Sequence, residues 1–300
     1  MKNVSINSCG VIEVIRQLES KNNLSSASFE ETIHGAHPYL KMLQEEYGAV
    51  LETAAGWQLT YAPEWLAPVS CALPVEILDE TSSTQQYIRQ QRAPCAIFAE
   101  YQSGGMGRRG NPWLALPADA ILLSVRLPRP PAIAGVSVAL GVCLCMALSP
   151  QLRFKWPNDI VNLQGHKIAG ILTEAVGDDL LVGVGVNWRM TATLAQRIAA
   201  GGRPAAALHR EQTTVTSRNQ CAQLVLQTII NTVAAYRDGF APFRQAAIAC
   251  HSIAVGEIVQ FSSNRGEVFC GFDDDGALLT NQQTITMNLT DAGGEHVVGG

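Results

Sequence analysis

The sequence has few charged and few aromatic residues. Of its 300 residues, 16% are charged, 6% are aromatic and 47% are hydrophobic. Disordered proteins have the opposite balance, so this chain has enough apolar surface to offset the entropy that the backbone loses on folding. We therefore expect a globular protein, and the length fits two or three domains at roughly 100 to 200 residues per domain.

The sequence also has fewer basic than acidic residues, and its cysteines do not follow a metal-binding pattern. The 21 Lys and Arg against 26 Asp and Glu give a formal net charge of −5, so the chain as a whole has no general attraction to polyanions. The eight cysteines include no C-x-x-C pair, and no histidines follow at zinc-finger spacing. We expect reduced thiols, no metal site built from protein side chains, and a cytoplasmic location, because the N-terminus has no secretory-signal pattern.

Long apolar runs are limited to one. Residues 132–148 carry no charge and lie between Pro130-Pro131 and Pro150. The run has 17 residues, whereas a membrane-spanning helix needs about 20. We predict a buried helix under a sheet rather than a membrane segment.

Three units follow from the pattern along the chain. In residues 1–68, helical patterns at 11–18 and 39–47 precede two short apolar runs at 49–52 and 57–61, which is typical of a winged helix-turn-helix. Prolines 63, 68 and 74 mark a linker. Residues 72–250 alternate strands and helices, which predicts an α/β (α+β) domain with a long central sheet. Residues 252–300 have short β runs broken by turn residues, which predicts a small all-β module.

The predicted elements of the middle unit can be given by residue number. The strands are expected at 75–78, 95–101, 120–127, 152–156, 170–176 and 180–187, and the helices at 84–91, 132–148 and within 217–243.

A glycine-rich loop carries two adjacent arginines. Residues 105–110 read G-M-G-R-R-G and match G-x-G-x-x-G, but Trp113 and another strand follow where a dinucleotide fold begins a helix. The kinase and Walker motifs are missing too. What remains is a loop in which Arg108 and Arg109 can grip phosphate or carboxylate oxygens. The alternative is a solvated hairpin tip.

A second group of polar residues follows the apolar run. Residues 155–159 read K-W-P-N-D at the end of a predicted strand, residues 167–170 read K-I-A-G before the next strand, and residues 183–187 end on Asn187. Each segment alone also fits an ordinary turn. Together they supply cations, an aromatic ring, a carboxylate and an amide at strand ends, where α/β folds assemble their sites.

With these segments, the chain resembles biotin protein ligases, in particular the bacterial ligase-repressors that have an N-terminal winged helix. The resemblance is carried by residues 83–87, 99–113, 155–159, 167–170 with Glu174, and 183–187, in the family's order and at similar spacing. It implies a central mixed sheet of the biotin/lipoate ligase type and a C-terminal SH3-like β-barrel that helps to close the nucleotide site.

The resemblance also implies an activity. Such enzymes join the carboxylate of biotin to the α-phosphate of ATP, release pyrophosphate, and pass the acyl group from biotinyl-AMP to a lysine of a biotin carboxyl carrier domain of acetyl-CoA carboxylase. Mg²⁺ would screen the triphosphate. Self-association through the exposed edge of the central sheet is a further implication.

Roles for individual residues come from the same resemblance. The catalytic residues would be Arg108, Lys167 and Asp159, the last positioning or deprotonating the incoming lysine. Biotin would be bound by Ser83, Thr84, Gln102, Gly105, Met106, Arg108, Lys167 and Gly170. ATP or the adenylate would be bound by Arg108, Arg109, Trp113, Asn158 and Asn187. For Ser83 and Thr84, a simple helix N-cap is the alternative.

One residue departs from the family. Met106 stands where the usual loop, G-R-G-R-R-G, has its first arginine, and Asn111-Pro112 replaces an often basic pair. Losing one charge-assisted contact would lower adenylation or retention of the intermediate about 10- to 150-fold. Two other functions therefore stay open: adenylation of another acid or transfer to another amine, and a non-catalytic protein that binds biotin or its adenylate.

The N-terminal unit is poorly suited to DNA. Residues 1–73 contain four basic and eight acidic side chains, a net charge of −4. The helix expected to enter the groove, residues 36–47, contains Pro38 and a single lysine, Lys41, and the turn before it is short. Since DNA binding requires cations facing phosphates, we predict a vestigial or protein-contacting unit without operator binding.

Overall fold

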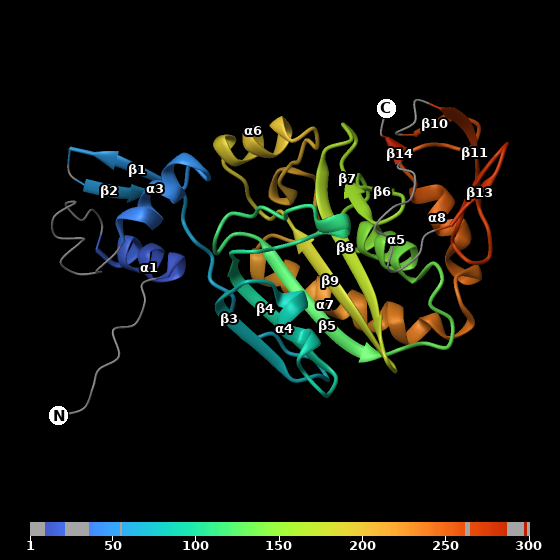
Figure 1. Cartoon of the computed structure of the whole chain (residues 1–300), viewed down its shortest axis with the longest axis horizontal. Helices are drawn as coiled ribbons and strands as arrows, with labels where there is room; N and C mark the ends of the chain where they lie inside the picture. Colours follow the sequence, from blue (N-terminus) through green and yellow to red (C-terminus); the bar gives the residue numbers. More distant parts are fainter. Residues whose placement is uncertain (1–9, 22–35, 55, 262–264, 287–296, 299–300) are drawn as a thin grey trace.

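The computed structural model describes residues 10–21, 36–54, 56–261, 265–286 and 297–298 (Figure 1). An N-terminal unit lies at one end, a long sheet with its helices occupies the middle, and a small β unit lies at the other end. The turn predicted to be short between the first two helices falls within 22–35, outside the described residues.

The N-terminal unit has two helices and a hairpin. The helices are α1 (Val11–Lys21) and α3 (His37–Glu45), and β1 (Val50–Thr53) pairs antiparallel with β2 (Gly56–Leu59). Pro38 lies in the first turn of α3, where its missing N–H costs no hydrogen bond. The elements predicted for this segment are therefore present, with bounds shifted by up to three residues.

This unit is packed against the middle of the molecule. Its buried side chains share one apolar core with Tyr101 of the sheet, Leu116 of a loop and Leu194 of α6 (Ala192–Ala200). The ring of Tyr47 meets that of Tyr101 edge to face, with centroids 6.5 Å apart. The described part of the N-terminal unit is therefore joined to the sheet by apolar burial as well as by the linker.

Residues 62–74 form an extended linker held along the central unit. The backbone N–H of Leu66 donates to Glu100 at 2.7 Å, and the side chain of Asn219 donates to the carbonyl of Trp65 at 3.0 Å. Gln223 exchanges two hydrogen bonds with the backbone of Ser70. The proline-rich segment is thus bonded at several points.

The central sheet has seven strands in the order β3-β4-β5-β9-β8-β7-β6. β3 and β4 are parallel and all other neighbours are antiparallel, so the sheet is mixed. The strands are β3 (Val75–Thr81), β4 (Cys95–Gln102), β5 (Ile121–Pro128), β6 (Arg153–Lys155), β7 (Asp159–Val161), β8 (Lys167–Val176) and β9 (Asp179–Val186).

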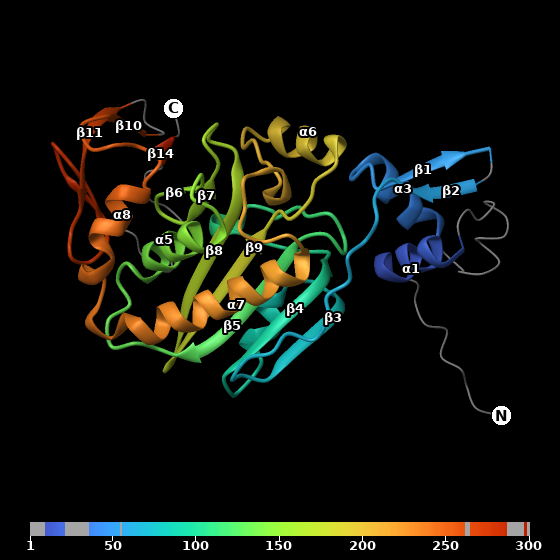
Figure 2. The same ribbon diagram turned by 180° about the vertical axis from the view of Figure 1, so that it is seen from behind.

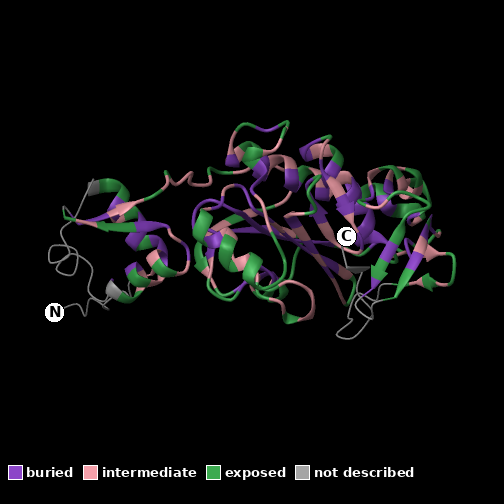
Figure 3. Cartoon of the chain, turned by 90° about the horizontal axis from the view of Figure 1, so that it is seen from above, coloured by how far each residue is buried: buried purple, intermediate pink, exposed green. Residues whose placement is uncertain are grey.

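Helices cover both faces of this sheet. The short α4 (Thr84–Arg89) lies on one face, and α5 (Val136–Leu148) and α7 (Arg218–Ala235) lie on the other (Figure 2). Alternating side chains of β4 serve the two faces: Phe98 packs in the α5 and α7 core, and Ile97 packs against Ile88 of α4. Burial is accordingly concentrated in the sheet and the helices beside it (Figure 3).

The apolar run forms the buried helix α5, as predicted. Most of its side chains are buried, and a Cβ on Gly141 would lie 2.4 Å from the ring of Phe154, so only glycine allows this close approach. Among the residues that the structure covers, no helix is both long and apolar enough to span a bilayer.

Three elements were not predicted. β7 follows β6 as the second strand of a tight hairpin, α6 occupies a segment for which no element was predicted, and α8 (Arg244–Cys250) lies next to the C-terminal unit. β8 begins at Lys167, three residues before the predicted strand.

The C-terminal unit is a five-stranded antiparallel sheet in the order β13-β12-β11-β10-β14. Its strands are β10 (Ile258–Phe261), β11 (Gly266–Phe272), β12 (Leu278–Thr280), β13 (Thr284–Ile285) and β14 (Val297–Val298). His251 joins this sheet to the central core. The centroid of its buried ring lies 4.6 Å from the ring centroid of Phe269 and 6.3 Å from that of Phe154.

Candidate active site

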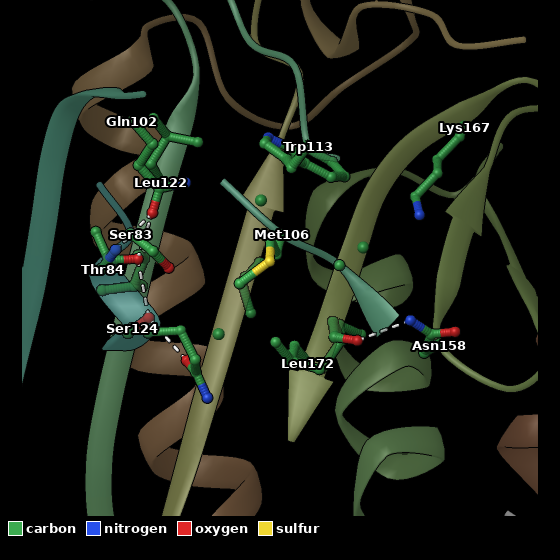
Figure 4. A pocket seen from close by; sticks show the side chains of 18 residues that line it. Ser83, Thr84, Gln102, Met106, Trp113, Leu122, Ser124, Asn158, Lys167 and Leu172 are labelled. Atoms are coloured by element: carbon green, nitrogen blue, oxygen red, sulfur yellow. Dashed lines mark hydrogen bonds between the residues drawn. The ribbon is translucent and has the colours of Figure 1, made fainter. Parts of the chain in front are cut away.

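The candidate site is an open hollow on the α4 side of the sheet. It is lined by β5, β8 and β9, by the start of α4 and by the loop after β4. Polar side chains gather at one side, Lys167 and Asn158 lie at the other, and Met106 lies between them with Trp113 above (Figure 4).

The polar side is built by a short chain of hydrogen bonds. The backbone N–H and the hydroxyl of Thr84 both contact Oε1 of Gln102, at 2.6 and 2.9 Å. Ser124 in turn lies 2.9 Å from the hydroxyl of Thr84 (Figure 4). Ser83 occupies the N-cap position of α4, yet its side chain makes no capping bond there. The helix-cap interpretation therefore describes its position but not its bonding.

The glycine-arginine loop folds back on itself. Met106 and Pro112 form an isolated antiparallel bridge, and the N–H of Trp113 donates to the carbonyl of Gly105 at 2.8 Å. A Cβ on Gly105 would lie 2.9 Å from the carbonyl oxygen of Trp113, so the turn requires glycine at this point. The tip has Arg109 with a φ of 61°, a backbone conformation that non-glycine residues rarely adopt.

Trp113 lies directly on the strands. A Cβ on Gly185 would come within 2.5 Å of the indole ring, and one on Gly170 within 3.2 Å. These two glycines therefore make room for the ring on β9 and β8. The ammonium of Lys167 lies 5.4 Å from the ring centroid, within the range of a cation–π contact.

Three charged groups meet at the hairpin of β6 and β7. Lys167 Nζ forms an ion pair with Asp159 Oδ1 at 2.5 Å. Lys155 lies close to both, and its pKa is lowered chiefly by burial and further by Lys167, while Asp159 opposes the shift. Lys155 belongs to the predicted K-W-P-N-D segment, but sequence reasoning gave it no role of its own.

Two amide side chains hold this end together. Asn158 donates to the carbonyl of Ile171 at 2.8 Å and accepts from Arg108 at 3.4 Å. Asn187 is buried behind the hollow and donates to the carbonyl of Lys167 at 3.2 Å. Asn158 thus connects the arginine loop to the sheet, and Asn187 supports the backbone of Lys167.

Most of the predicted site residues line one hollow. Those in its wall are Ser83, Thr84, Gln102, Met106, Trp113, Asn158, Lys167 and Gly170. Of the others, Arg108 and Asp159 contact the wall through Asn158 and Lys167, and Gly105 supports the loop. Arg109 and Asn187 lie outside the lining.

Sequence reasoning missed two polar residues of the wall, Gln85 and Ser124. Ser124 is buried in β5, and Gln85 follows Thr84 on α4. A serine inside the otherwise apolar run ILLSV was the available signal, because a buried hydroxyl needs a partner. Gln85 had no such signal.

Comparison with known families identifies the central sheet. Residues 76–190 match the biotin/lipoate A/B protein ligase family. This part of the chain is similar to biotin/lipoate ligase domains. The matched residues run from the second residue of β3 through the other six strands, and they include every residue that lines the hollow.

Curated relatives match the same part of the chain. The bifunctional ligase/repressor BirA of Escherichia coli is 36% identical over 132 residues, which cover 39% of this chain and 41% of that protein. The biotin–[acetyl-CoA-carboxylase] ligase of Mycobacterium tuberculosis is 32% identical over 130 residues, covering 38% of this chain and 48% of that one. The matched part of the chain thus spans less than half the length of these relatives.

Solved structures are similar to this chain in their fold. The biotin protein ligase of Aquifex aeolicus in complex with biotin and ATP superposes with a TM-score of 0.61 at 21% identity, covering 75% of this chain and 99% of that one. A Helicobacter pylori enzyme described with bound biotinylated ATP gives a TM-score of 0.52 at 18% identity, covering 72% and 100%. These likenesses confirm the predicted α/β fold with a central mixed sheet.

Proposed function

We propose that this protein is an ATP-dependent biotin protein ligase. It would activate biotin as biotinyl-5′-AMP and transfer the biotinyl group to a lysine of a biotin carboxyl carrier protein. The observation that carries the proposal is the hollow of the ligase domain, which has hydrogen-bonding groups at one side and the Lys167–Asp159 ion pair, backed by Lys155, at the other. A ligand with a polar ring and a carboxylate tail matches that arrangement.

The first step would bring two anions together. A carboxylate oxygen of biotin attacks the α-phosphorus of ATP, the bond from that phosphorus to the bridging oxygen breaks, and pyrophosphate leaves. Lys167 and Arg108 would offset the repulsion, because fixed cations in a partly water-excluded site stabilise charge that builds up on the reacting oxygens. The contact between Arg108 and Asn158 supports this role, since it holds the arginine against the hollow.

In the second step the amine of the carrier lysine attacks the acyl carbon. An amide bond forms, AMP leaves, and the amine loses a proton. Asp159 is the carboxylate beside the hollow and would orient or accept the proton of the amine, as the family resemblance implies. Its ion pair with Lys167 keeps it beside the point where the carboxylate of biotin would lie.

The nucleotide would lie toward Trp113, whose ring would stack on adenine, with Asn187 reading the edge of the base and Arg109 near the phosphates. Base stacking of this kind is worth roughly 1 to 3 kcal/mol. Among the described residues there is no group of three or more His, Cys, Asp or Glu side chains that could hold a metal ion. Mg²⁺ would arrive with ATP, because Mg²⁺ usually binds substrate phosphates and one or two carboxylates.

The flanking units would serve the same reaction. We assign residues 1–68 to a degenerate winged helix-turn-helix, residues 72–250 to the catalytic domain and residues 252–300 to an SH3-like barrel that helps to close the nucleotide site. The excess of acidic residues before residue 73 and the apolar docking of the first unit support a structural role over DNA binding. We also propose self-association through the sheet edge.

The test is turnover with purified protein. We expect pyrophosphate release that requires both ATP and biotin, and an added carrier domain that gains the mass of one biotinyl group. A binding protein without catalysis would retain biotin and release no pyrophosphate. If a panel of other carboxylates supports pyrophosphate release and biotin does not, the enzyme is an adenylating relative with a different acid.

The alternative that the enzyme adenylates a different acid rests on Met106. Its side chain is 46% exposed and lies in the wall of the hollow, where the family has arginine. An apolar, flexible side chain at this point favours a ligand tail with fewer oxygens or more carbon, so medium-chain acids and lipoate belong in that panel.

A further inference from the structure

Two thiols meet where α5 packs against α8. The two helices are neighbours in both views (Figure 1, Figure 2). Cys145 lies near the end of α5 and is fully buried, whereas Cys250 is the last residue of α8 and is partly exposed. Their side chains are hydrogen-bonded to each other, and both pack in the core on the same face of the central sheet. Contact between two sulfurs is the first condition for a disulfide.

Cys143 lies near this pair, but its hydrogen bond is to another helix. Positions two apart on an α-helix point about 200° apart. The sulfur of Cys143 accepts a hydrogen bond from Thr232 of α7, while Cys145 is turned toward α8. Cys143 is therefore a natural internal comparison for Cys145.

The surroundings of Cys250 favour its thiolate. The Cys145 thiol donates to its sulfur, and this bond does most to lower the pKa of Cys250 to about 7, against the effect of burial. The N–H of Phe154 and the positive charge of Arg153 lower this pKa further. Burial instead raises the pKa of the Cys145 thiol well above its usual range. Because the thiolate is the nucleophile in cysteine chemistry, the partly exposed partner is reactive at neutral pH and the buried partner is protonated.

We propose that Cys250 and Cys145 form an oxidisable dithiol that reacts with hydroperoxides. The Cys250 thiolate attacks one oxygen of the hydroperoxide, the S–O bond forms, the O–O bond breaks, and water or an alcohol leaves after taking up a proton. The sulfur of Cys145 then attacks the sulfenic acid. The S–S bond forms, the S–O bond breaks, and water leaves with the thiol proton. The two thiols together lose the two electrons that reduce the hydroperoxide.

The disulfide would tie the C-terminal unit to the central core. α8 leads directly into that unit, and the next residue, His251, pairs with Phe154 of β6. A covalent bond between α5 and α8 closes a long loop of chain, which restricts the unfolded state and stabilises the folded one. The dithiol lies outside the hollow, so the inference does not depend on the proposed function.

The experiment treats the reduced full-length protein with hydrogen peroxide at a series of pH values from about 5.5 to 8.5. Remaining thiols are blocked with N-ethylmaleimide, and mass spectrometry of tryptic peptides locates the linked cysteines. Cys145→Ala and Cys250→Ser each remove one partner, and Cys143→Ala is the matched control on the same helix. No lysine or arginine separates Cys143 from Cys145, so the variants decide which of the two is linked.

We expect one link, with a loss of about 2 Da, between Cys250 and the α5 peptide in the unmodified protein and in Cys143→Ala. Cys145→Ala and Cys250→Ser should abolish it. The rate of linking should rise with pH around a midpoint near 7 and level off above about pH 8. Oxidation should raise the melting temperature by about 5 °C or more, and dithiothreitol should reverse the rise.

A link that persists in Cys145→Ala or disappears in Cys143→Ala would overturn the assignment of the pair. If Cys145→Ala does not fold, Cys143→Ala decides alone, because a link that survives it can involve only Cys145 on that peptide. A rate that still climbs steeply above about pH 8 would refute the attacking role of Cys250, since an ordinary thiol ionises there. Linked protein with an unchanged melting temperature would refute the tether.

Discussion

Arg218 and Glu100 form an ion pair that is almost entirely closed to water. The guanidinium Nη1 lies 2.5 Å from Oε2, with the side chains 0% and 2% exposed. Arg218 also bonds to the carbonyls of Ala120 and Glu64, and the second oxygen of Glu100 accepts from Leu66. One pair thus joins the start of α7, the strand that leads into the site loop, and the linker.

Breaking this pair should cost much of the stability of the protein. Glu100→Gln or Arg218→Met would leave one buried charge unpaired, and such changes typically cost about 3 to 5 kcal/mol. Urea unfolding followed by circular dichroism measures the loss. The control is Asp79→Asn, which disrupts the exposed pair with Arg16 and should cost at most about 1 kcal/mol. An equal loss of unfolding free energy in the buried-pair and exposed-pair variants would show that burial does not set the contribution of an ion pair here.

Removing the cations of the site should slow the first chemical step. Lys167→Ala and Arg108→Ala are each expected to lower the rate of pyrophosphate release about 10²- to 10³-fold, since each removes a fixed charge from the reacting oxygens. Rapid-quench measurement of biotinyl-AMP formation isolates that step. Arg237→Ala, at an exposed position away from the hollow, should react normally. Near-normal rates for both site variants would mean that the site is elsewhere.

Restoring the family arginine should strengthen retention of the intermediate. Met106→Arg would place a guanidinium in the wall of the hollow, and one charge-assisted contact corresponds to about 10- to 150-fold slower release of biotinyl-AMP. Release can be followed by trapping the free adenylate with hydroxylamine. Met146→Arg adds the same charge at an exposed methionine of α5 and should leave release unchanged. Unchanged release in both variants would show that Met106 does not face the adenylate.

The stability of the protein should depend on pH through Asp119. Its side chain is wholly buried, and burial raises the pKa of the carboxyl to about 7, although Arg189 lies 3.5 Å away. The unfolded carboxyl loses its proton near pH 4 and the folded one near pH 7, so the free energy of unfolding falls as pH rises through that window, by about 1.4 kcal/mol per unit. Asp119→Asn should remove this contribution, so that in urea titrations from pH 4.5 to 7.5 the stability of the variant relative to the unmodified protein rises with pH. A variant with the slope of the unmodified protein would contradict the assignment.

His251 should make the free energy of unfolding depend on pH in the opposite direction. Burial lowers the pKa of its imidazole to about 4, so the folded protein keeps the ring neutral while the unfolded chain binds a proton near pH 6.5. The free energy of unfolding is therefore lost as pH falls from about 6.5 toward 4. His251→Phe keeps an aromatic ring beside Phe269 and should remove this contribution, so that the melting temperature at pH 4.5 relative to that at pH 7 is higher in the variant than in the unmodified protein. Persistent acid sensitivity in the variant would assign it to other groups.

The parts of the site that were predictable are those written into contiguous segments. The glycine-arginine loop, the K-W-P-N-D hairpin and Lys167 lie in short motifs, and the structure brings their lining members to one hollow. Gln85 was missed because its place in the wall depends on contacts such as its hydrogen bond to Glu174, 89 residues away, and only the packing of α4 on the sheet brings the two together. Long-range pairs of this kind leave no local periodicity in a single sequence.

The fold also has parts that follow from contiguous segments and parts that depend on long-range contacts. The apolar helix α5 and the strands of the sheet follow from hydrophobic runs, whereas β7 has only three residues and α6 is stabilised largely by contacts. Thr191, which caps α6, also donates to the carbonyl of Tyr47 in the first unit. The sequence pattern shows the cap but not the surface on which the helix lies.

The apolar core shared between the first unit and the sheet has a practical consequence for dissection of this protein. Cutting the chain within the linker would remove the side chains that pack on Tyr101, Leu116 and Leu194. The remaining protein would expose this apolar surface to solvent. A protein shortened in this way should therefore aggregate more readily than the full chain, before any effect on its chemistry can be measured.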